Sequence, residues 1–292
     1  MALNVRIYLV LLTSMVLGWL LICAHSIELL VRYTDILILL GITLLYIASH
    51  GFRMLRLALL TLDERDKAFE LITAHALTAF PSSFLPFKIG ELLRLSAFFH
   101  VFGHRRKAFA IWLAERFGDV LVITALILSL YLFNVSMPNS MRAIFIIFTL
   151  VSVFGLLGLF AVANVLVYLN RHLVLTSHSA RGLMLLRASY VLRRLELEIY
   201  KSVEGRLIGF LLLSMLIWAL EIAALSAFIN HYSIGELDFA SMFTSGLLAS
   251  LPGGVVGEAR AFGLYQSLAL ALLTVLFLAA LWLANNLKLV RY

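Results

Sequence analysis

The chain has 292 residues, of which 63% are hydrophobic and 13% are charged, and its formal net charge is +7. Soluble domains are about half apolar and about a quarter charged, so this composition excludes a soluble globular protein. It predicts a single integral membrane domain over residues 1–292. We attribute the positive charge to Lys- and Arg-rich cytoplasmic loops and expect no nucleic-acid partner.

The sequence also lacks the usual signals of bound cofactors. Its one cysteine, Cys23, excludes an internal disulfide framework. No pair of His and Cys residues has the spacing of metal ligands, and no phosphate-binding loop indicates an ATP site. We therefore expect neither a metal nor another cofactor.

The first two apolar runs, residues 7–23 and 36–52, are predicted membrane spans. The segment 53–67 that follows is basic, which predicts a cytoplasmic position and places the link between the two spans outside. Arg53 and Arg56 stand at the predicted end of the second span. Long basic side chains at such ends commonly reach toward the lipid headgroups, and we expect the same here.

Residues 69–103 form an apolar segment that is long enough for two crossings, but Pro81, Pro86 and Gly90 interrupt it. Basic residues flank this segment on both sides, including the run 104–107, so both of its ends are expected in the cytoplasm. This predicts either a re-entrant hairpin or a pair of broken helices. Interrupted backbone at membrane depth needs protein or a watery cavity to satisfy its polar groups.

Residues 108–133 and 141–169 are predicted to cross outward and back. Residues from about 170 to 206 are basic and are predicted to form a cytoplasmic loop. Within this loop, apolar and basic side chains segregate roughly at helical spacing. The pattern favours an amphipathic helix on the inner leaflet or, equally, a solvated extension of the neighbouring spans.

Residues 207–229 are predicted to cross outward and residues 261–283 to cross back, which places both termini in the cytoplasm. Residues 239–257 are then left over and predict a second re-entrant segment, entering from outside. The predicted fold is an all-α polytopic membrane protein with about six transmembrane helices and two oppositely oriented re-entrant or broken segments. Such a pair suggests an inverted repeat with a substrate site near the membrane midplane.

The first group of candidate substrate-binding residues is Lys88, Glu91 and Arg94. Glu91 and Arg94 are spaced i, i+3, so they share one face of a helix that begins near the predicted break. A helix N-terminus favours an anion such as a lipid phosphate, and the planar guanidinium of Arg94 suits phosphate. Alternatively, the pair only holds two helices together, although charges at membrane depth are usually functional.

The second group is Glu115, Arg116 and Asp119, which share a helix face in the following span. The two carboxylates could balance Arg94 or Arg53, or accept a proton or an amine. A purely structural network is an equally good interpretation, because buried ion networks are not always sites. Glu221 is alone in its span and is either paired across helices or lines a cavity.

The third group follows Pro252 and interrupts an apolar segment in the second half of the chain: Gly253, Gly254, Gly257, Glu258 and Arg260. Glycines let the backbone turn sharply or approach a ligand closely. Interrupted apolar segments in both halves of a chain are the best sequence pointer to a transporter site. The alternative is an ordinary turn at the membrane surface.

These three groups resemble the membrane domain of the lysylphosphatidylglycerol synthase/flippase family. Residues 86–94 are similar to its P-x-x-x-G-E-x-x-R signature, residues 115–119 to its E-R-x-x-D, and residues 252–258 to its P-G-G-x-G-x-x-E. The motifs occur in the family's order over most of the chain. The last motif departs from the pattern, since Val256 stands where glycine is expected, and the sequence contains no aminoacyl-transferase domain.

The resemblance implies a flippase-like transporter, not an enzyme, in the cytoplasmic membrane of a prokaryote. It would move a phospholipid, or a lipid-linked aminoacyl or glycosyl headgroup, across the bilayer. The expected partners are membrane lipids and an anionic or lipid-linked substrate, with a second copy of the chain or envelope biosynthesis enzymes as further candidates. Two alternatives stay open: a membrane-embedded transferase with Glu91 or Asp119 as the base, and a non-transporting subunit of an envelope glycan or lipid assembly machine.

Overall fold

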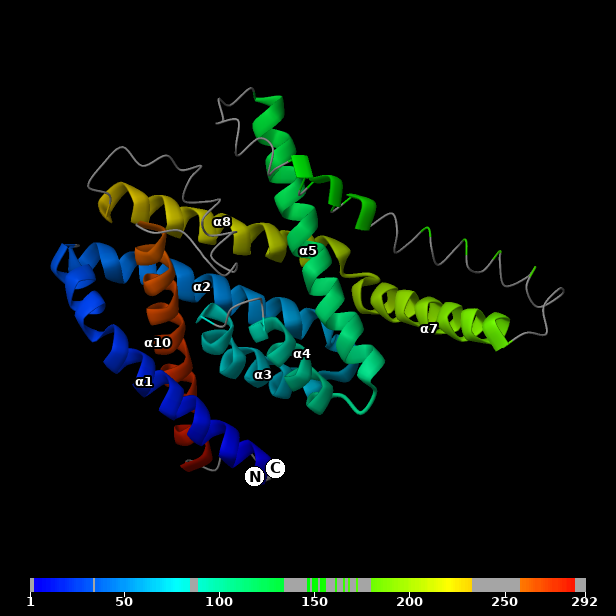
Figure 1. Cartoon of the computed structure of the whole chain (residues 1–292), viewed down its shortest axis with the longest axis horizontal. Coiled ribbons are helices and arrows are strands. Elements are labelled where there is room, and N and C mark those ends of the chain that lie inside the picture. The colour runs from blue at the N-terminus through cyan, green and yellow to red at the C-terminus, as the bar shows by residue number, and fades with distance from the viewer. Residues whose placement is uncertain are drawn as a thin grey trace. The chain divides into compact units, whose positions relative to one another are not determined.

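The computed structural model of the chain describes residues 3–33, 35–84, 89–133, 180–232 and 258–286, together with isolated positions between 146 and 172. Every regular element in these residues is a helix, and no strand occurs among them (Figure 1). The all-α prediction is therefore confirmed for this part of the chain.

Four of the described helices are long and apolar enough to cross a membrane. They are α1 (Leu3–Tyr33), α2 (Ile36–Leu60), α8 (Leu207–Tyr232) and α10 (Glu258–Asn286). The 26 residues of α8, for example, rise about 39 Å at 1.5 Å per residue, which exceeds the roughly 30 Å of hydrocarbon in a bilayer. These helices support a membrane protein, whereas the total of about six spans and the side on which the termini lie stay predictions.

The second span is longer than predicted. α2 runs without interruption to Leu60, so Arg53 and Arg56 lie inside the helix and not beyond its end. The predicted boundary after residue 52 is wrong by about two helical turns. The residues after Arg56 are again apolar, and the helix ends only where Thr61 leads into the short 3-10 helix η1 (Leu62–Glu64).

The segment predicted to be broken contains two helices, α3 (Arg65–Phe84) and α4 (Ile89–Val101). Gly90 lets them approach closely, because a Cβ atom added there would lie 2.2 Å from the Cα of Ser82. Any larger residue would force the two backbones apart. Two helices agree with the predicted pair of broken helices, and the re-entrant path remains a prediction.

The chain forms two compact units, which are described separately. Unit 1 comprises Met1–Leu55, Phe69–Ala97 and Leu216–Tyr292, and unit 2 comprises Arg56–Ala68 and Phe98–Met215. The boundaries fall inside α2, α3, α4 and α8, so each of these helices contributes residues to both units.

The core of unit 1 is built from apolar side chains of α1, α2, α3, α8 and α10. Large rings fill its centre. Trp19 meets Phe80 edge-on with ring centroids 5.7 Å apart, and Phe228 lies 5.2 Å from Tyr265. The interior of this unit is therefore a buried apolar core, while many apolar side chains on the other faces of its helices are exposed.

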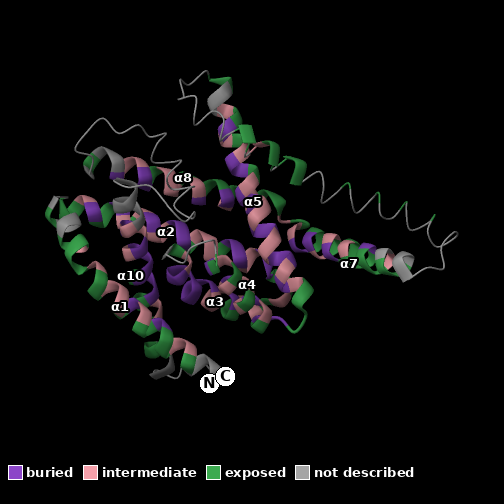
Figure 2. Cartoon of the chain, in the orientation of Figure 1, coloured by how far each residue is buried: buried purple, intermediate pink, exposed green. Residues whose placement is uncertain are grey.

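Unit 2 is organised around α5 (Arg105–Leu132) and α7 (Ala180–Val203), which pack against each other. Leu195, Ile199 and Ser202 form part of the buried face of α7, and much of the rest of this helix is exposed (Figure 2). A helix is thus present where the amphipathic pattern predicts one. Its position relative to lipid stays a prediction.

Two sequence-based predictions lie outside the described residues. The second re-entrant segment, residues 239–257, is one of them. The span over residues 141–169 is the other, apart from isolated helical positions within it.

Candidate functional site

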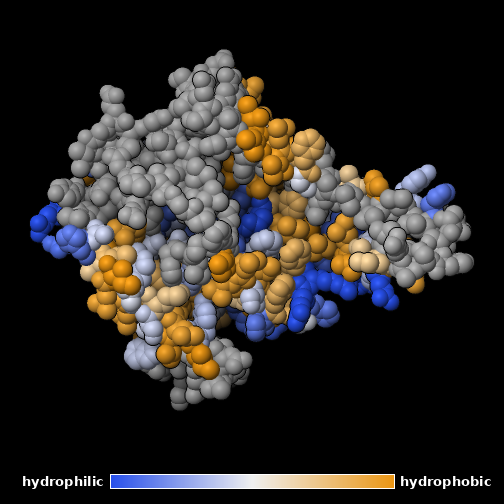
Figure 3. Space-filling model, in the orientation of Figure 1, coloured by the Kyte–Doolittle hydropathy of each residue, from blue (hydrophilic) through white to orange (hydrophobic). Residues whose placement is uncertain are grey.

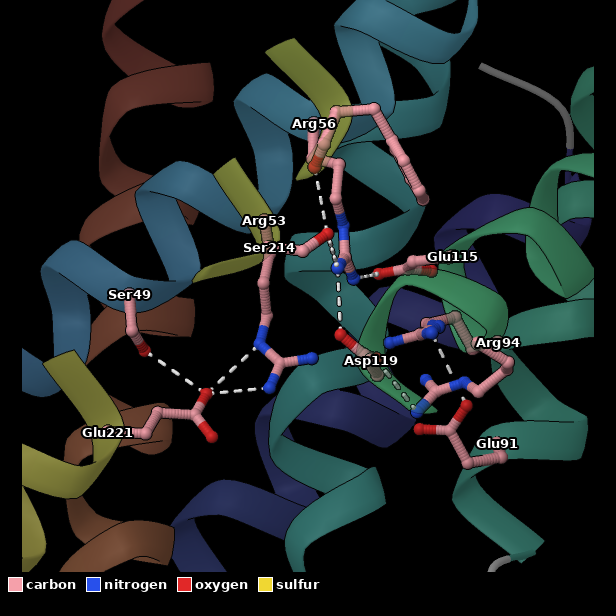
Figure 4. A network of polar contacts seen from close by, with 11 residues as sticks. Ser49, Arg53, Arg56, Glu91, Arg94, Glu115, Asp119, Ser214 and Glu221 are labelled. Carbon is pink, nitrogen blue, oxygen red and sulfur yellow. Dashed lines mark hydrogen bonds and ion pairs between the residues drawn. The ribbon is translucent and has the colours of Figure 1, made fainter. Parts of the chain in front are cut away.

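The described helices bury several ionisable side chains, and Figure 4 shows the polar contacts between them. One cluster, in unit 2, centres on Arg56. In unit 1, Arg53 forms an ion pair with Glu221, and Arg94 forms another with Glu91. Charges in membrane helices are costly unless they are paired or face a watery cavity, so each of these groups is a candidate for a structural or a functional role.

In unit 2, the guanidinium of Arg56 is surrounded by acceptors. Its Nη1 donates to Asp119 Oδ1 at 2.7 Å and to Ser214 Oγ at 2.9 Å, and its Nη2 donates to Glu115 Oε1 at 3.1 Å. The ring of Phe210 lies 5.9 Å from the guanidinium carbon. The side chains of Arg56 and Glu115 are completely buried. These contacts replace the water that both ions lose on burial.

The sequence assembles this cluster by helical spacing. Glu115 and Asp119 are spaced i, i+4 on α5, so their carboxylates lie one turn apart on the same face. Ser214, on α8, donates to the carbonyl of Phe210 at 2.9 Å and thereby turns its oxygen toward Arg56. A Cβ atom on Gly118 would lie 2.5 Å from Phe210 and 2.7 Å from Ser214 Oγ, so the glycine makes room for both.

The cluster in unit 2 is electrically balanced. Arg116 Nη1 lies 3.6 Å from Asp119 Oδ2, which adds a second cation. Arg56 and Arg116 together carry two positive charges, and Glu115 and Asp119 carry two negative ones. Burial of the central Arg56 and the balance of charges are features of a structural ion network rather than of an open substrate site.

In unit 1, the guanidinium of Arg53 donates twice to one carboxylate oxygen. Its Nε and Nη2 both donate to Glu221 Oε1, at 3.1 and 2.6 Å, and Ser49 Oγ donates to the same oxygen at 3.3 Å. The side chains of Arg53 and Glu221 remain 12% and 17% exposed. Glu221 is therefore paired across helices, which was one of the two predicted alternatives.

Also in unit 1, Arg94 Nη2 lies 3.3 Å from Glu91 Oε2 within the first two turns of α4. The side chain of Arg94 is 5% exposed, whereas that of Glu91 is 25% exposed. Glu91 also lies in the first turn, where a negative charge interacts favourably with the helix dipole. The pair thus combines a buried cation with a carboxylate that solvent or a ligand can reach.

No protein-family model matches the chain, and neither a curated protein nor a solved structure gives a match. The resemblance carried by the three motifs therefore remains a hypothesis.

The structure divides the predicted site residues into three sets. Glu91 and Arg94 form a pair in unit 1, while Glu115, Arg116 and Asp119 belong to the cluster of unit 2. Glu258 and Arg260 lie in the first turn of α10, where only the backbone is described. The remaining members lie outside the described residues: Lys88, Gly253, Gly254 and Gly257.

Sequence reasoning overlooked Arg56, which is the centre of the cluster in unit 2. The expectation that Arg53 and Arg56 reach toward lipid headgroups is wrong, because both guanidinium groups are held by carboxylates inside the protein. The sequence does contain a signal that both arginines lie inside the helix. The apolar run Leu57-Ala58-Leu59-Leu60 follows Arg56 and extends the helix beyond both arginines.

The arrangement of Glu91 and Arg94 is suited to binding an anion. No group of three or more His, Cys, Asp and Glu side chains that could hold a metal ion occurs in the described part of the chain. Among Arg53, Arg56 and Arg94, Arg94 has the most exposed carboxylate partner, and guanidinium groups bind phosphate through paired hydrogen bonds. We therefore take Glu91 and Arg94 as the candidate functional site.

Proposed function

We propose that this protein is a flippase-like lipid transporter that recognises the phosphate of a phospholipid or of a lipid-linked headgroup. The observation that carries the proposal is the Glu91–Arg94 ion pair at the start of α4, within a predominantly apolar protein. Charges at membrane depth usually mark a substrate path. The three motifs that resemble the lysylphosphatidylglycerol synthase/flippase family point to the same activity.

The exposure of the two side chains suggests how a phosphate would bind. Arg94 is buried and always charged, so it provides a fixed cation. Glu91 is the more exposed partner, and its carboxylate occupies a position that a phosphate oxygen could take. Exchange of one anion for the other would keep Arg94 paired, so the substrate could enter and leave without stranding a buried charge.

The cluster around Arg56 has a different role in this proposal. Its central guanidinium is held by two carboxylates and its charges cancel, so it serves as the rigid support of unit 2. Residues Glu115, Arg116 and Asp119 would then affect transport through stability and not through contact with the lipid. This departs from the substrate-binding role predicted for them from sequence.

A reconstitution experiment tests the proposal. The full chain is incorporated into vesicles of phosphatidylcholine and phosphatidylglycerol that contain phosphatidylglycerol labelled with a fluorophore on its acyl chain. A membrane-impermeant quencher then reports how much label reaches the outer leaflet. We expect protein-dependent translocation that Arg94→Gln reduces by roughly tenfold or more, in line with the loss of a charge-assisted contact. Arg94→Lys should restore part of it, since a point charge replaces a planar fork.

Arg193→Gln is the matched control, because Arg193 is an exposed arginine of α7 that forms an ion pair with Glu196 on the same helix. It should translocate lipid at the wild-type rate. Wild-type activity of Arg94→Gln, in protein that is as thermally stable as the parent, would contradict the role of Arg94. The absence of translocation by the wild-type chain, with lipid-linked substrates included in the vesicles, would contradict the proposed function as a whole.

A further inference from the structure

Unit 2 contains a pocket that the proposed function does not use. Its volume is about 280 Å³, close to the lower end of the roughly 300–1,000 Å³ typical of small-molecule sites. The turn between α4 and α5, the helix η1 and the helix α7 enclose it. Its ionisable lining residues are Glu64, His104, Arg106, Lys107, Arg194 and Glu198.

Two of these residues are already fixed in place. Lys107 Nζ donates to Glu64 Oε1 at 2.6 Å, and the Lys107 side chain is mostly buried. The guanidinium of Arg194 lies over the ring of Tyr190, 5.0 Å from its centroid. Such contacts hold a basic side chain in one orientation before any ligand arrives, which lowers the entropy that binding has to overcome. The pocket therefore presents oriented cations.

The charges of the lining favour an anion. Arg106, Lys107 and Arg194 carry three positive charges against the two negative charges of Glu64 and Glu198. Hydrophilic surface gathers where the α4–α5 turn and the adjoining edge of α7 lie (Figure 3). Phe102 and Gly103 complete the lining, and Gly103 has open space where a side chain would project.

The start of α5 provides an independent argument. This helix of 28 residues begins at Arg105 and has no acidic residue in its first turn. A helix N-terminus carries a partial positive charge that is stabilised by anions and destabilised by cations. Here the first three residues are all basic, so the sequence places the least favourable charge at this end. A bound anion would relieve this repulsion and would meet N–H groups at the start of the helix, where that of Lys107 already donates to the carbonyl of His104 at 3.0 Å.

From these observations we propose that the pocket between the α4–α5 turn, η1 and α7 binds a phosphate group. The volume fits a phosphate or diphosphate group and excludes a whole lipid, so the ligand is either a free phosphate compound or the headgroup of a lipid whose chains stay outside. In this assignment Arg106 and Arg194 contact the phosphate from opposite sides, and the N–H groups of α5 complete the site. The proposal does not depend on transport, because binding is measured directly.

Calorimetric titration of the full chain in phosphatidylcholine nanodiscs, in phosphate-free buffer, tests the proposal. One arm adds inorganic diphosphate, and the other adds dihexanoyl phosphatidic acid, which is a soluble lipid with a phosphate monoester headgroup. Arg106→Gln and Arg194→Gln should each weaken binding by about tenfold, as expected for a charge-assisted contact. Glu198→Gln should strengthen it, because that variant removes a negative charge from the lining.

Arg187→Gln is the control on α7, since Arg187 is exposed and does not line the pocket. It should bind like the wild-type chain, and thermal unfolding of every variant verifies that it is folded. Binding of diphosphate alone assigns the pocket to a soluble phosphate compound, and binding of the short-chain lipid, with or without diphosphate, assigns it to a headgroup. The proposal is overturned if neither probe binds the wild-type chain. It is also overturned if the probe that binds has the same affinity for Arg106→Gln and Arg194→Gln as for the wild-type chain.

Discussion

Arg53 and Arg56 are three residues apart on α2, yet they belong to different units and are held in different ways. Arg53 shares a single carboxylate oxygen of Glu221 with Ser49, and both charged side chains keep some exposure. Arg56 is fully buried and reaches two carboxylates and a hydroxyl. One turn of one helix thus separates a partly solvated ion pair from a buried ion network.

The environment of each arginine therefore determines how much its ion pair contributes to the stability of the fold. Removing one partner of a partly exposed pair strands a charge that the protein does not fully enclose, so the loss of stability is small. A buried network contributes little in net terms while it is complete, but it becomes very costly when one member is lost, since the remaining charges stay buried without partners. The four predictions that follow test this contrast, beginning with the largest expected effect.

Arg56→Met should lower the free energy of unfolding by about 3–5 kcal/mol, because it leaves Glu115 and Asp119 buried without the guanidinium that they share. Chemical unfolding in mixed detergent micelles measures the change. Adding Glu115→Gln and Asp119→Asn to the same variant should recover much of the loss, since the buried charges are then gone. If Arg56→Met costs no more than Arg53→Met, the contrast between the two units does not hold.

Gly118→Ala should destabilise the chain by about 1–3 kcal/mol, which is the usual cost of forcing extra atoms into a packed interior. The new Cβ atom would collide with Phe210 and with the hydroxyl of Ser214, and thereby disturb an acceptor of Arg56. Gly41→Ala is the matched control in α2, where nothing lies within 4 Å. That variant should be neutral or slightly stabilising, because alanine favours a helix more than glycine does. Equal stability of the two variants would show that α5 and α8 are looser here than described.

Arg53 and Glu221 should show a coupling energy of about 1 kcal/mol in a double-mutant cycle, at the lower end of the range for residues in direct contact. The cycle uses Arg53→Gln, Glu221→Gln and the double variant, again followed by unfolding in mixed micelles. Partial exposure of both side chains keeps the value low. A coupling as strong as that between Arg56 and Asp119 would mean that the two pairs are equally buried in the membrane.

Arg193→Ala should change the free energy of unfolding by less than about 0.5 kcal/mol, because Arg193 is exposed and its partner Glu196 lies on the same helix. Increasing the salt concentration should remove even this contribution, since surface charges are screened. This variant sets the baseline for the series. A loss comparable to that of Arg53→Gln would show that α7 is held by its surface charges.

The four membrane helices could be predicted from the sequence because each is an apolar run of sufficient length. The pairing of Glu91 with Arg94 was also accessible, since a spacing of i, i+3 places both on one helix face. Spacing along the chain says nothing about contacts between distant helices. The partners of Arg53 and Arg56 stand 168 and 59 residues further along, and the packing of α2 against α8 and α5 determines them.

The same separations along the chain determine the order in which the two ion pairs can form during translation. At about 5–20 residues per second, Glu115 follows Arg56 off the ribosome after about 3–12 s, whereas Glu221 follows Arg53 after about 8–34 s. During that longer interval α2 carries an arginine whose final counter-ion does not yet exist, at a cost in lipid of several kcal/mol. The insertion machinery, water or a lipid phosphate must supply a temporary partner. Unit 1 contains the first helix of the chain, yet it is the last unit to be completed, because it also contains Leu216–Tyr292.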